Sequence, residues 1–346
     1  MHETLSKERP VSANQETISS DHDGSLLEAL AGVFKAGGDR LRLDILRVLR
    51  RDTFGVMELS QIFAMGQSGM SHHLKVLARA GLLEPQREGN AIFYRRPLAW
   101  HNSGPQQQAA QGIFTAVDSL PLSREMLEQV ALIREQRAAQ SQAFFARNAA
   151  RFREQQELIA EHHQYAEPVA ALIAQQFASS PAQRALEIGP GEGEFLAILA
   201  AGFAQVTGVD NAREMLDQAA ATCARQQLNN VELVLGECDQ LESNHTGHGY
   251  DLVVANMVLH HVAGPADIFH HSARLLAPGG RLVISELCRH EQRWVRDNCG
   301  DLWQGFEPEE LTGWARDAGL HAGETIFIGL RNGFQIQVRE FINSQS

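Results

Sequence analysis

The sequence predicts two domains of different fold class: a mainly α-helical N-terminal domain with a β-hairpin, and a C-terminal α/β domain with a mostly parallel sheet. The chain has 346 residues, about twice the size of a usual domain. Apolar residues recur at helical spacing near the N-terminus, whereas short apolar runs alternate with helical stretches from residue 184 onward. The second pattern is typical of strands covered by helices.

Changes in composition and apolar periodicity along the chain predict the domain boundaries. Residues 1–24 are polar without apolar periodicity, so we expect a disordered tail. The N-terminal domain is expected over residues 25–102. Residues 103–181 begin with the polar stretch SGPQQQAAQG and continue with helix-forming residues, which predicts a helical linker. The α/β domain is expected over residues 182–346.

Four helices are expected in the N-terminal domain, over residues 26–34, 41–49, 56–64 and 68–80, followed by a hairpin around Glu88-Gly89-Asn90. The fourth helix has an apolar face and a face of hydroxyl, imidazole and basic side chains: Ser68, Ser71, His72, Lys75 and Arg79. Such side chains donate to phosphates and base edges. An ordinary amphipathic surface helix has the same two faces, so this helix alone does not distinguish a DNA-binding helix from a surface helix.

The stretch ELSQIFAMGQSGMSHHLKVLARAGLLEPQREGNAIFYRR resembles the winged helix-turn-helix regulators of the ArsR/SmtB family in the order of helix, turn, recognition helix and wing. The resemblance implies a homodimer that binds a double-stranded DNA operator, with the first helix as subunit contact. It also implies which residues face DNA: Gln67, Ser68, Ser71, His72 and Lys75 of the recognition helix, and Arg87, Arg95 and Arg96 of the wing.

No metal site is predicted. Metal-sensing members of that family carry a Cys-x-Cys pair before the turn, where this chain reads FGVMELSQIF. His72 and His73 are neighbours on a helix and point about 100° apart, so they do not chelate one ion. Four cysteines without a CxxC pair predict no disulfide framework and no zinc ribbon. With no long apolar run and no secretory signal, we expect a cytoplasmic protein without a membrane partner.

The segment ALEIGPGEGEFLAIL predicts a strand, a glycine loop and a helix. Gly189, Gly191 and Gly193 let the backbone pass close to a ligand, and Glu187 ends the strand. The next strand, VTGVD, ends in Asp210, where a carboxylate accepts hydrogen bonds from ribose hydroxyls. Dinucleotide-dependent dehydrogenases use a similar loop, so the loop alone leaves that class open.

The succession VELVLGECDQL, YDLVVANMVLHHV and RLLAPGGRLVISEL makes residues 184–290 similar to class I S-adenosylmethionine-dependent methyltransferases. The resemblance implies a Rossmann-like fold, S-adenosylmethionine as cofactor and S-adenosylhomocysteine as product. Glu237 stands where the family has the Asp that meets the adenine amino group, with Asp239 as a substitute. The residues implied to bind the cofactor are Glu187, Gly189, Gly191, Gly193, Asp210, Glu237, Cys238 and Asn256.

His260 and His261 are the candidates for a catalytic base that removes the acceptor's proton, although residues of this stretch also pack and cap a helix. The pairs His162-His163 and His270-His271 are expected at the surface. No Asn/Asp-Pro-Pro-aromatic motif and no Pro-Cys pair is present, which leaves a small-molecule acceptor. Four aromatic residues either fold over the pocket or belong to the core: Trp294, Trp303, Phe306 and Trp314.

The net charge of −12 divides unevenly, with +4 on residues 26–100 and −11 on residues 182–346. This asymmetry favours a DNA-binding module attached to an acidic one. Two functions are compatible with the whole sequence. One is a transcription regulator whose methyltransferase domain methylates a small molecule. The other is a non-catalytic transcriptional sensor of S-adenosylmethionine or S-adenosylhomocysteine, for example of methionine-cycle genes.

Overall fold

The computed structural model describes residues 14–88, 91–98, 104–148, 152–178, 183–244, 249–292 and 294–344. The main boundary between its two compact units falls between Met126 and Leu127. None of the helices in these ranges combines the length and apolar character that crossing a bilayer requires.

The first unit is mainly helical and carries a small antiparallel sheet. Its helices are α1 (Asn14–Gly37), α2 (Arg40–Val48), α3 (Val56–Ile62), α4 (Gln67–Arg79) and α5 (Pro105–Asp118). Three strands, β1 (Phe54–Gly55), β2 (Glu84–Glu88) and β3 (Ala91–Arg95), are ordered β1-β3-β2. The α3–α4 pair followed by the β2–β3 hairpin confirms the predicted helix-turn-helix with a wing.

Two predicted boundaries differ from the structure. Helix α1 begins at Asn14, so residues 14–24 are helical rather than part of a tail; residues 1–13 lie outside the described residues. Helix α5 packs against α1 and α2 and belongs to the first unit. The segment expected as a linker also holds α6 (Arg124–Asn148), α7 (Phe152–Glu157) and α8 (His162–Phe177), so it divides between the two units.

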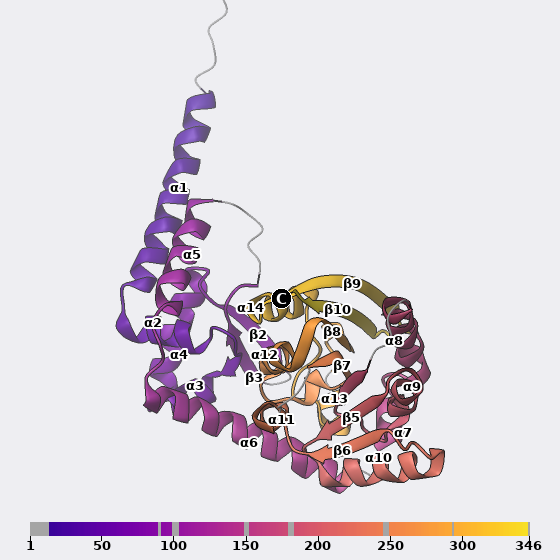
Figure 1. Ribbon diagram of the computed structural model, residues 1–346. Coiled ribbons are helices and arrows are strands. Elements are labelled where there is room, and N and C mark those ends of the chain that lie inside the picture. The colour runs from indigo at the N-terminus through magenta and orange to yellow at the C-terminus, as the bar shows by residue number, and fades with distance from the viewer. Residues whose placement is uncertain are drawn as a thin grey trace, which may run out of the picture. The chain divides into compact units, whose positions relative to one another are not determined.

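The second unit is an α/β domain around a seven-stranded sheet (Figure 1). The strands are β4 (Arg184–Ile188), β5 (Gln205–Asp210), β6 (Val231–Leu235), β7 (Tyr250–Asn256), β8 (Leu276–Leu287), β9 (Leu320–Gly329) and β10 (Gln335–Asn343), in the order β6-β5-β4-β7-β8-β10-β9. The first five pair in parallel, and β10 is antiparallel to both β8 and β9. The predicted mostly parallel sheet is confirmed.

Helices of this unit also include α9 (Glu194–Gly202), α10 (Arg213–Gln226), α11 (Cys238–Asn244), α12 (Pro265–Leu275), α13 (Trp294–Cys299) and α14 (Pro308–Asp317). The chain runs outward from β4 in both directions, to β5 and β6 on one side and to β7 and β8 on the other. In such sheets ligands bind outside the carboxyl ends of the strands at the point where the order reverses. That point lies at the ends of β4, β5 and β7.

Candidate functional site

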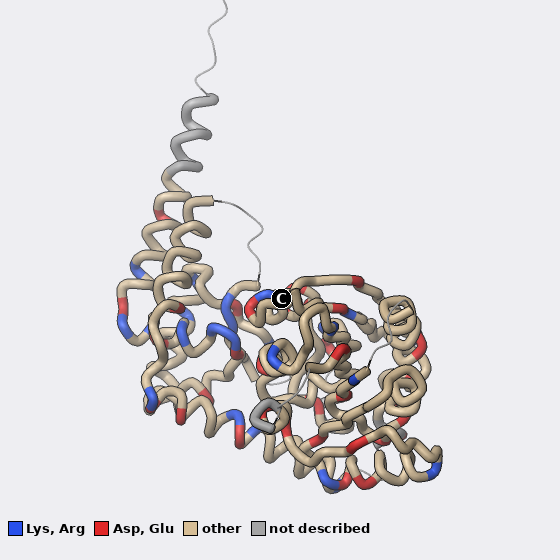
Figure 2. Tube along the Cα trace, in the orientation of Figure 1, with Lys and Arg blue, Asp and Glu red and all other residues tan. Residues whose placement is uncertain are grey.

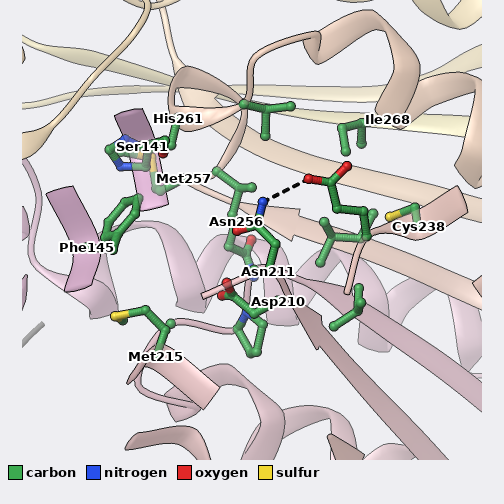
Figure 3. A pocket seen from close by; sticks show the side chains of 18 of the residues that line it. Ser141, Phe145, Asp210, Asn211, Met215, Cys238, Asn256, Met257, His261 and Ile268 are labelled. Atoms are coloured by element: carbon green, nitrogen blue, oxygen red, sulfur yellow. Dashed lines mark hydrogen bonds between the residues drawn. The ribbon is translucent and has the colours of Figure 1, made fainter. Parts of the chain in front are cut away.

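A cavity of about 810 Å³ lies in the second unit at the carboxyl ends of these strands (Figure 3). The loops after β4, β5, β6 and β7 contribute to its lining, and so do α6, α8 and α12. Seven of the eight predicted cofactor residues line this cavity: Glu187, Gly189, Gly191, Asp210, Glu237, Cys238 and Asn256.

The glycine loop has a backbone that only glycine adopts easily. Gly189, Gly191 and Gly193 have φ angles of 64°, 57° and 80°. A Cβ on Gly189 would lie 2.6 Å from Cγ2 of Val258, across the cavity wall. Gly193 lies outside the lining, and a Cβ there would lie 3.0 Å from Cα of Ala219 on α10. Gly193 therefore supports the loop by close packing behind it.

Two carboxyl groups line the cavity, Glu187, which is buried, and Asp210, which is half-buried. Glu187 is 2% exposed, and its Oε2 has no hydrogen-bond partner among the described residues. Burial raises the pKa of Glu187 to about 8, partly offset by the neighbouring Asn256 amide. Burial likewise raises the pKa of Asp210 to about 6, although the carboxylate accepts a hydrogen bond from the Ala212 amide at 2.8 Å. An unpaired carboxylate here favours a cationic ligand.

The far end of the cavity is formed by the loop after β6. The amide of Asn211 donates to Oε1 of Glu237 at 3.0 Å (Figure 3), which orients this longer substitute for the family's Asp. Cys238 is buried and Asp239 is exposed, and both line the cavity. The Asp239 carboxylate accepts a hydrogen bond from the Gln240 amide.

The structure separates the two candidate histidines. His260 is fully buried outside the cavity lining, and its Nδ1 lies 2.6 Å from Oε1 of Glu286. Burial alone lowers the pKa of His260, but Glu286 and Asp301 outweigh it and raise the pKa to about 9. His261 lines the cavity, and burial and the charge of His260 hold its pKa well below the usual value. His261 is thus neutral near pH 7.

Helix α6 forms a wall that the sequence analysis did not predict. Ser141 and Phe145 lie beside His261 in Figure 3, and the Phe145 and His261 rings meet edge-on with centroids 5.0 Å apart. Arg134 pairs with Asp267 at 2.7 Å. The cavity residues of α6 follow helical spacing, the one sequence signal of this role: Ala131, Arg134, Glu135, Ala138, Ala139, Ser141, Gln142 and Phe145.

The aromatic residues predicted either over the pocket or in the core are absent from the cavity lining. Trp303 is 4% exposed and donates from Nε1 to the carbonyl of Val262, and Trp314 packs between Phe269 and Phe306. The core alternative is the one that fits. Conversely, His162 and His271 were expected at the surface and line the cavity instead.

In the first unit, α4 separates into two faces. Its apolar face is fully buried through Met70, Leu74 and Leu77. On the other face, Ser71 is half-buried and four predicted DNA contacts are exposed: Gln67, Ser68, His72 and Lys75. Figure 2 marks the basic residues of this unit along α2 and α4.

The wing arginines differ from one another. Arg87 is exposed, while Arg95 pairs with Glu84 at 3.3 Å. Arg96 donates to the carbonyl of Leu46 and to both carboxylate oxygens of Asp118, so it ties the end of β3 to α2 and α5. This placement does not fit the DNA contact expected of Arg96, because its guanidinium is already bonded inside the unit.

Comparison with known proteins agrees with this division. Residues 38–86 match the family described as a helix-turn-helix domain, and residues 152–323 match the family described as a methyltransferase domain. The ubiquinone biosynthesis O-methyltransferase of Coxiella burnetii is 28% identical over 167 residues, covering 44% of this chain and 70% of that protein. The Klebsiella pneumoniae enzyme of the same name is 29% identical over 171 residues, covering 46% and 69%.

Among solved structures, the N-methyltransferase NodS from Bradyrhizobium japonicum, in complex with S-adenosylhomocysteine, is 18% identical with a TM-score of 0.47 and covers 60% of this chain and 100% of that one. The two family matches and the sequence relatives define the chain as a two-domain protein with a nucleotide-cofactor site. More specifically, it joins a helix-turn-helix domain to an S-adenosylmethionine-dependent methyltransferase domain. The dehydrogenase alternative is wrong.

Proposed function

We propose that the protein is a DNA-binding transcription regulator whose methyltransferase domain methylates a small molecule with S-adenosylmethionine. The observation that carries the proposal is the single cavity that joins the glycine loop and Asp210 to His261 and helix α6. One end of this cavity suits the cofactor, and the other end offers a neutral imidazole to an acceptor.

The cofactor supplies a methyl group on a sulfonium that needs no further activation, so the residues of the chain mainly orient donor and acceptor. The Glu187 carboxylate, whose Oε2 is unpaired, binds the ammonium of the methionine part. Asp210 accepts from the ribose hydroxyls, and Glu237 and Cys238 border the adenine. Asn256 borders the methyl group, its side-chain oxygen held by the Ser285 hydroxyl at 2.9 Å.

His261 is the group that receives the acceptor's proton. Its low pKa keeps the imidazole neutral, which a base requires. The edge-on Phe145 ring beside it favours a flat, hydroxyl-bearing acceptor. The relatives that are O-methyltransferases support an oxygen acceptor. His260 has a supporting role, because its ring is bonded to Glu286 away from the cavity.

The first unit supplies the DNA contact. The exposed face of α4 enters the major groove, as in ArsR-type regulators, and Arg87 of the wing approaches the phosphates. On α1, the side chains of Leu26, Leu27 and Phe34 are 41%, 67% and 60% exposed, which supports a homodimer through this helix. Because a transcription regulator must reach chromosomal DNA, this function places the protein in the cytoplasm.

Helix α6 gives the second candidate function, a sensor of S-adenosylmethionine or S-adenosylhomocysteine. It is one continuous helix that starts in the first unit and lines the cavity from Ala131 to Phe145. Gln142 of this helix donates to the carbonyl of Asn211, next to Asp210. A ligand that binds the DNA-competent and incompetent states unequally, by roughly 1–3 kcal/mol, changes DNA affinity through such an element.

The test begins with calorimetric titration of S-adenosylmethionine and S-adenosylhomocysteine into the purified protein. We expect Asp210→Ala to weaken both affinities at least about tenfold, since a charged hydrogen-bond partner is worth about 1.5–3 kcal/mol. Asp217→Ala on α10 is the matched control, because this acid is exposed and outside the cavity. A wild-type protein that binds neither compound refutes the proposal.

A measurement of methyl transfer distinguishes the enzyme hypothesis from the sensor hypothesis. Formation of S-adenosylhomocysteine in the presence of a panel of phenols, and its loss in His261→Asn, supports the enzyme. Cofactor binding that shifts affinity for operator DNA, without product formation on any acceptor of the panel, favours the sensor.

A further inference from the structure

Asp301 is a buried carboxyl that the proposed chemistry leaves unexplained. It is 2% exposed, lies outside the cavity lining, and neither of its oxygens has a hydrogen-bond partner among the described residues. Burying a carboxyl without hydrogen bonds is costly, so its place behind His261 needs a reason.

The geometry around His261 supplies a reason for burying Asp301. Its Nδ1 lies 3.4 Å from the carbonyl oxygen of Gly300 and 3.8 Å from Oδ1 of Asp301. The carbonyl of Gly300 is an acceptor within hydrogen-bond distance, and Oδ1 of Asp301 lies just beyond that distance from the same nitrogen, so the proton of the neutral ring belongs on Nδ1. Nε2 then carries the lone pair, which is the form a base needs.

The backbone brings these two groups into place through a glycine in the left-handed region. Gly300 has φ of 78°, and a Cβ there would clash with Cδ1 of Phe144 on α6. No other residue fits this position without moving α6 or the loop. The carbonyl of Gly300 and the side chain of Asp301 are thereby directed to the same side of His261.

A metal ion is the competing explanation, because donor atoms of His260, His261 and Asp301 lie within 4.8 Å of one another. Two observations disfavour it. Glu286 and Asp301 raise the pKa of His260 to about 9, so near pH 7 both of its ring nitrogens carry protons and neither offers a lone pair to a metal ion. Of the three residues only His261 lines the cavity, so two of the three donors would hold an ion away from an acceptor.

We propose that Asp301 is a positioning residue for His261: its carboxylate holds the proton on Nδ1, directs Nε2 to the acceptor, and stabilises the imidazolium formed during methyl transfer. In that step the acceptor oxygen bonds to the methyl carbon, the bond from carbon to sulfur breaks, and the O–H proton passes to Nε2. The sulfonium becomes neutral S-adenosylhomocysteine. This inference rests on the proposed methyltransferase function.

The charged neighbours of Asp301 are consistent with that role. Burial raises the pKa of Asp301 to about 7, His260 lowers it, and Glu286 raises it. Cys299 also lies near and its pKa is raised, by burial first and then by Asp301. Oδ1 of Asp301 lies 3.8 Å from Nδ1 of His261, close enough for a negative charge on this carboxyl to stabilise the protonated ring.

The test is the tautomer of His261, read from long-range proton–nitrogen NMR spectra of the full-length protein with ¹⁵N-labelled histidine. His261→Asn identifies the signals. We expect a neutral ring with the proton on Nδ1 in the wild type, and loss of that single tautomer in Asp301→Asn. Asp301→Ala is the second variant if the first does not fold. Glu310→Gln is the matched control, because Glu310 is a buried acid that caps α14.

Three results overturn the inference. They are a wild-type proton on Nε2, an unchanged tautomer in a folded Asp301 variant, and one tightly bound metal ion per chain in the purified protein. Calorimetry with S-adenosylmethionine distinguishes these from failure of the proposed function. We expect the Asp301 variants to keep wild-type cofactor affinity, and a protein that binds no cofactor would instead refute the methyltransferase site itself.

Discussion

Replacing Glu187 by Gln should stabilise the cofactor-free protein while weakening cofactor binding. The folded protein raises the pKa of this carboxyl from an ordinary 4.5 to about 8 because the group is buried. At about 1.4 kcal/mol per pH unit, this sets an upper limit of about 5 kcal/mol on the cost of the ionised side chain. Gln has nearly the same shape and no charge, so it avoids this cost.

The sign of the effect follows from proton uptake. Between pH 4.5 and 8 the folded state holds a proton on Glu187 that the unfolded state has lost, so wild-type stability falls as the pH rises. The advantage of Glu187→Gln should therefore be absent at pH 4.5, grow toward pH 8 and remain constant above it.

Urea unfolding of both proteins from pH 5 to 9, with and without S-adenosylmethionine, measures this difference. The cofactor should stabilise the wild type more than the variant, because the carboxylate then has a cationic partner. An advantage that does not change with pH, or a variant that binds the cofactor as tightly as the wild type, would show that the Glu187 reasoning is wrong.

Three further predictions concern the other parts of the molecule. Lys75→Ala should weaken binding to any DNA duplex and reduce the magnitude of the slope of log affinity against log salt concentration by about 0.9, whereas the control Lys35→Ala on α1 should change neither. Fluorescence titrations at several salt concentrations measure this slope. Equal slopes for the wild type and Lys75→Ala would show that Lys75 does not contact a phosphate. Arg96→Gln should lower the free energy of unfolding of the first unit by about 1–3 kcal/mol through the loss of its bonds to Asp118, and an unchanged urea midpoint would contradict this. Gly189→Ala should abolish cofactor binding in calorimetry because a Cβ meets Val258 at 2.6 Å, with Gly202→Ala, where the space is open, as the control that keeps it.

Local pattern was sufficient for the parts of the site that lie within one strand–loop–helix segment. The glycines of the loop and Asp210 are predictable because their roles depend on backbone conformation and on the end of a strand. Helix α4 is predictable for the same reason, since both of its faces are visible in thirteen residues of sequence.

Pairings between distant segments were not predictable. Arg96 resembles a DNA contact in the sequence, and only the fold brings Asp118 and the carbonyl of Leu46 to its guanidinium. In the same way, the different surroundings of His260 and His261 depend on Glu286 and Asp301, 26 and 40 residues further along the chain. One sequence without related sequences carries no signal for such pairs.

The position of β10 determines when the second unit can fold as the chain is made. This strand is the last of the sheet in the sequence, yet it lies between β8 and β9 and supplies hydrogen bonds to both. Until residue 343 has left the ribosome, β9 has no neighbour and one edge of β8 stays open. The helix-turn-helix unit, complete by Met126, has no such constraint. During synthesis the protein therefore spends a period with one domain folded and an unpaired strand edge in the other, which is when aggregation is most favoured.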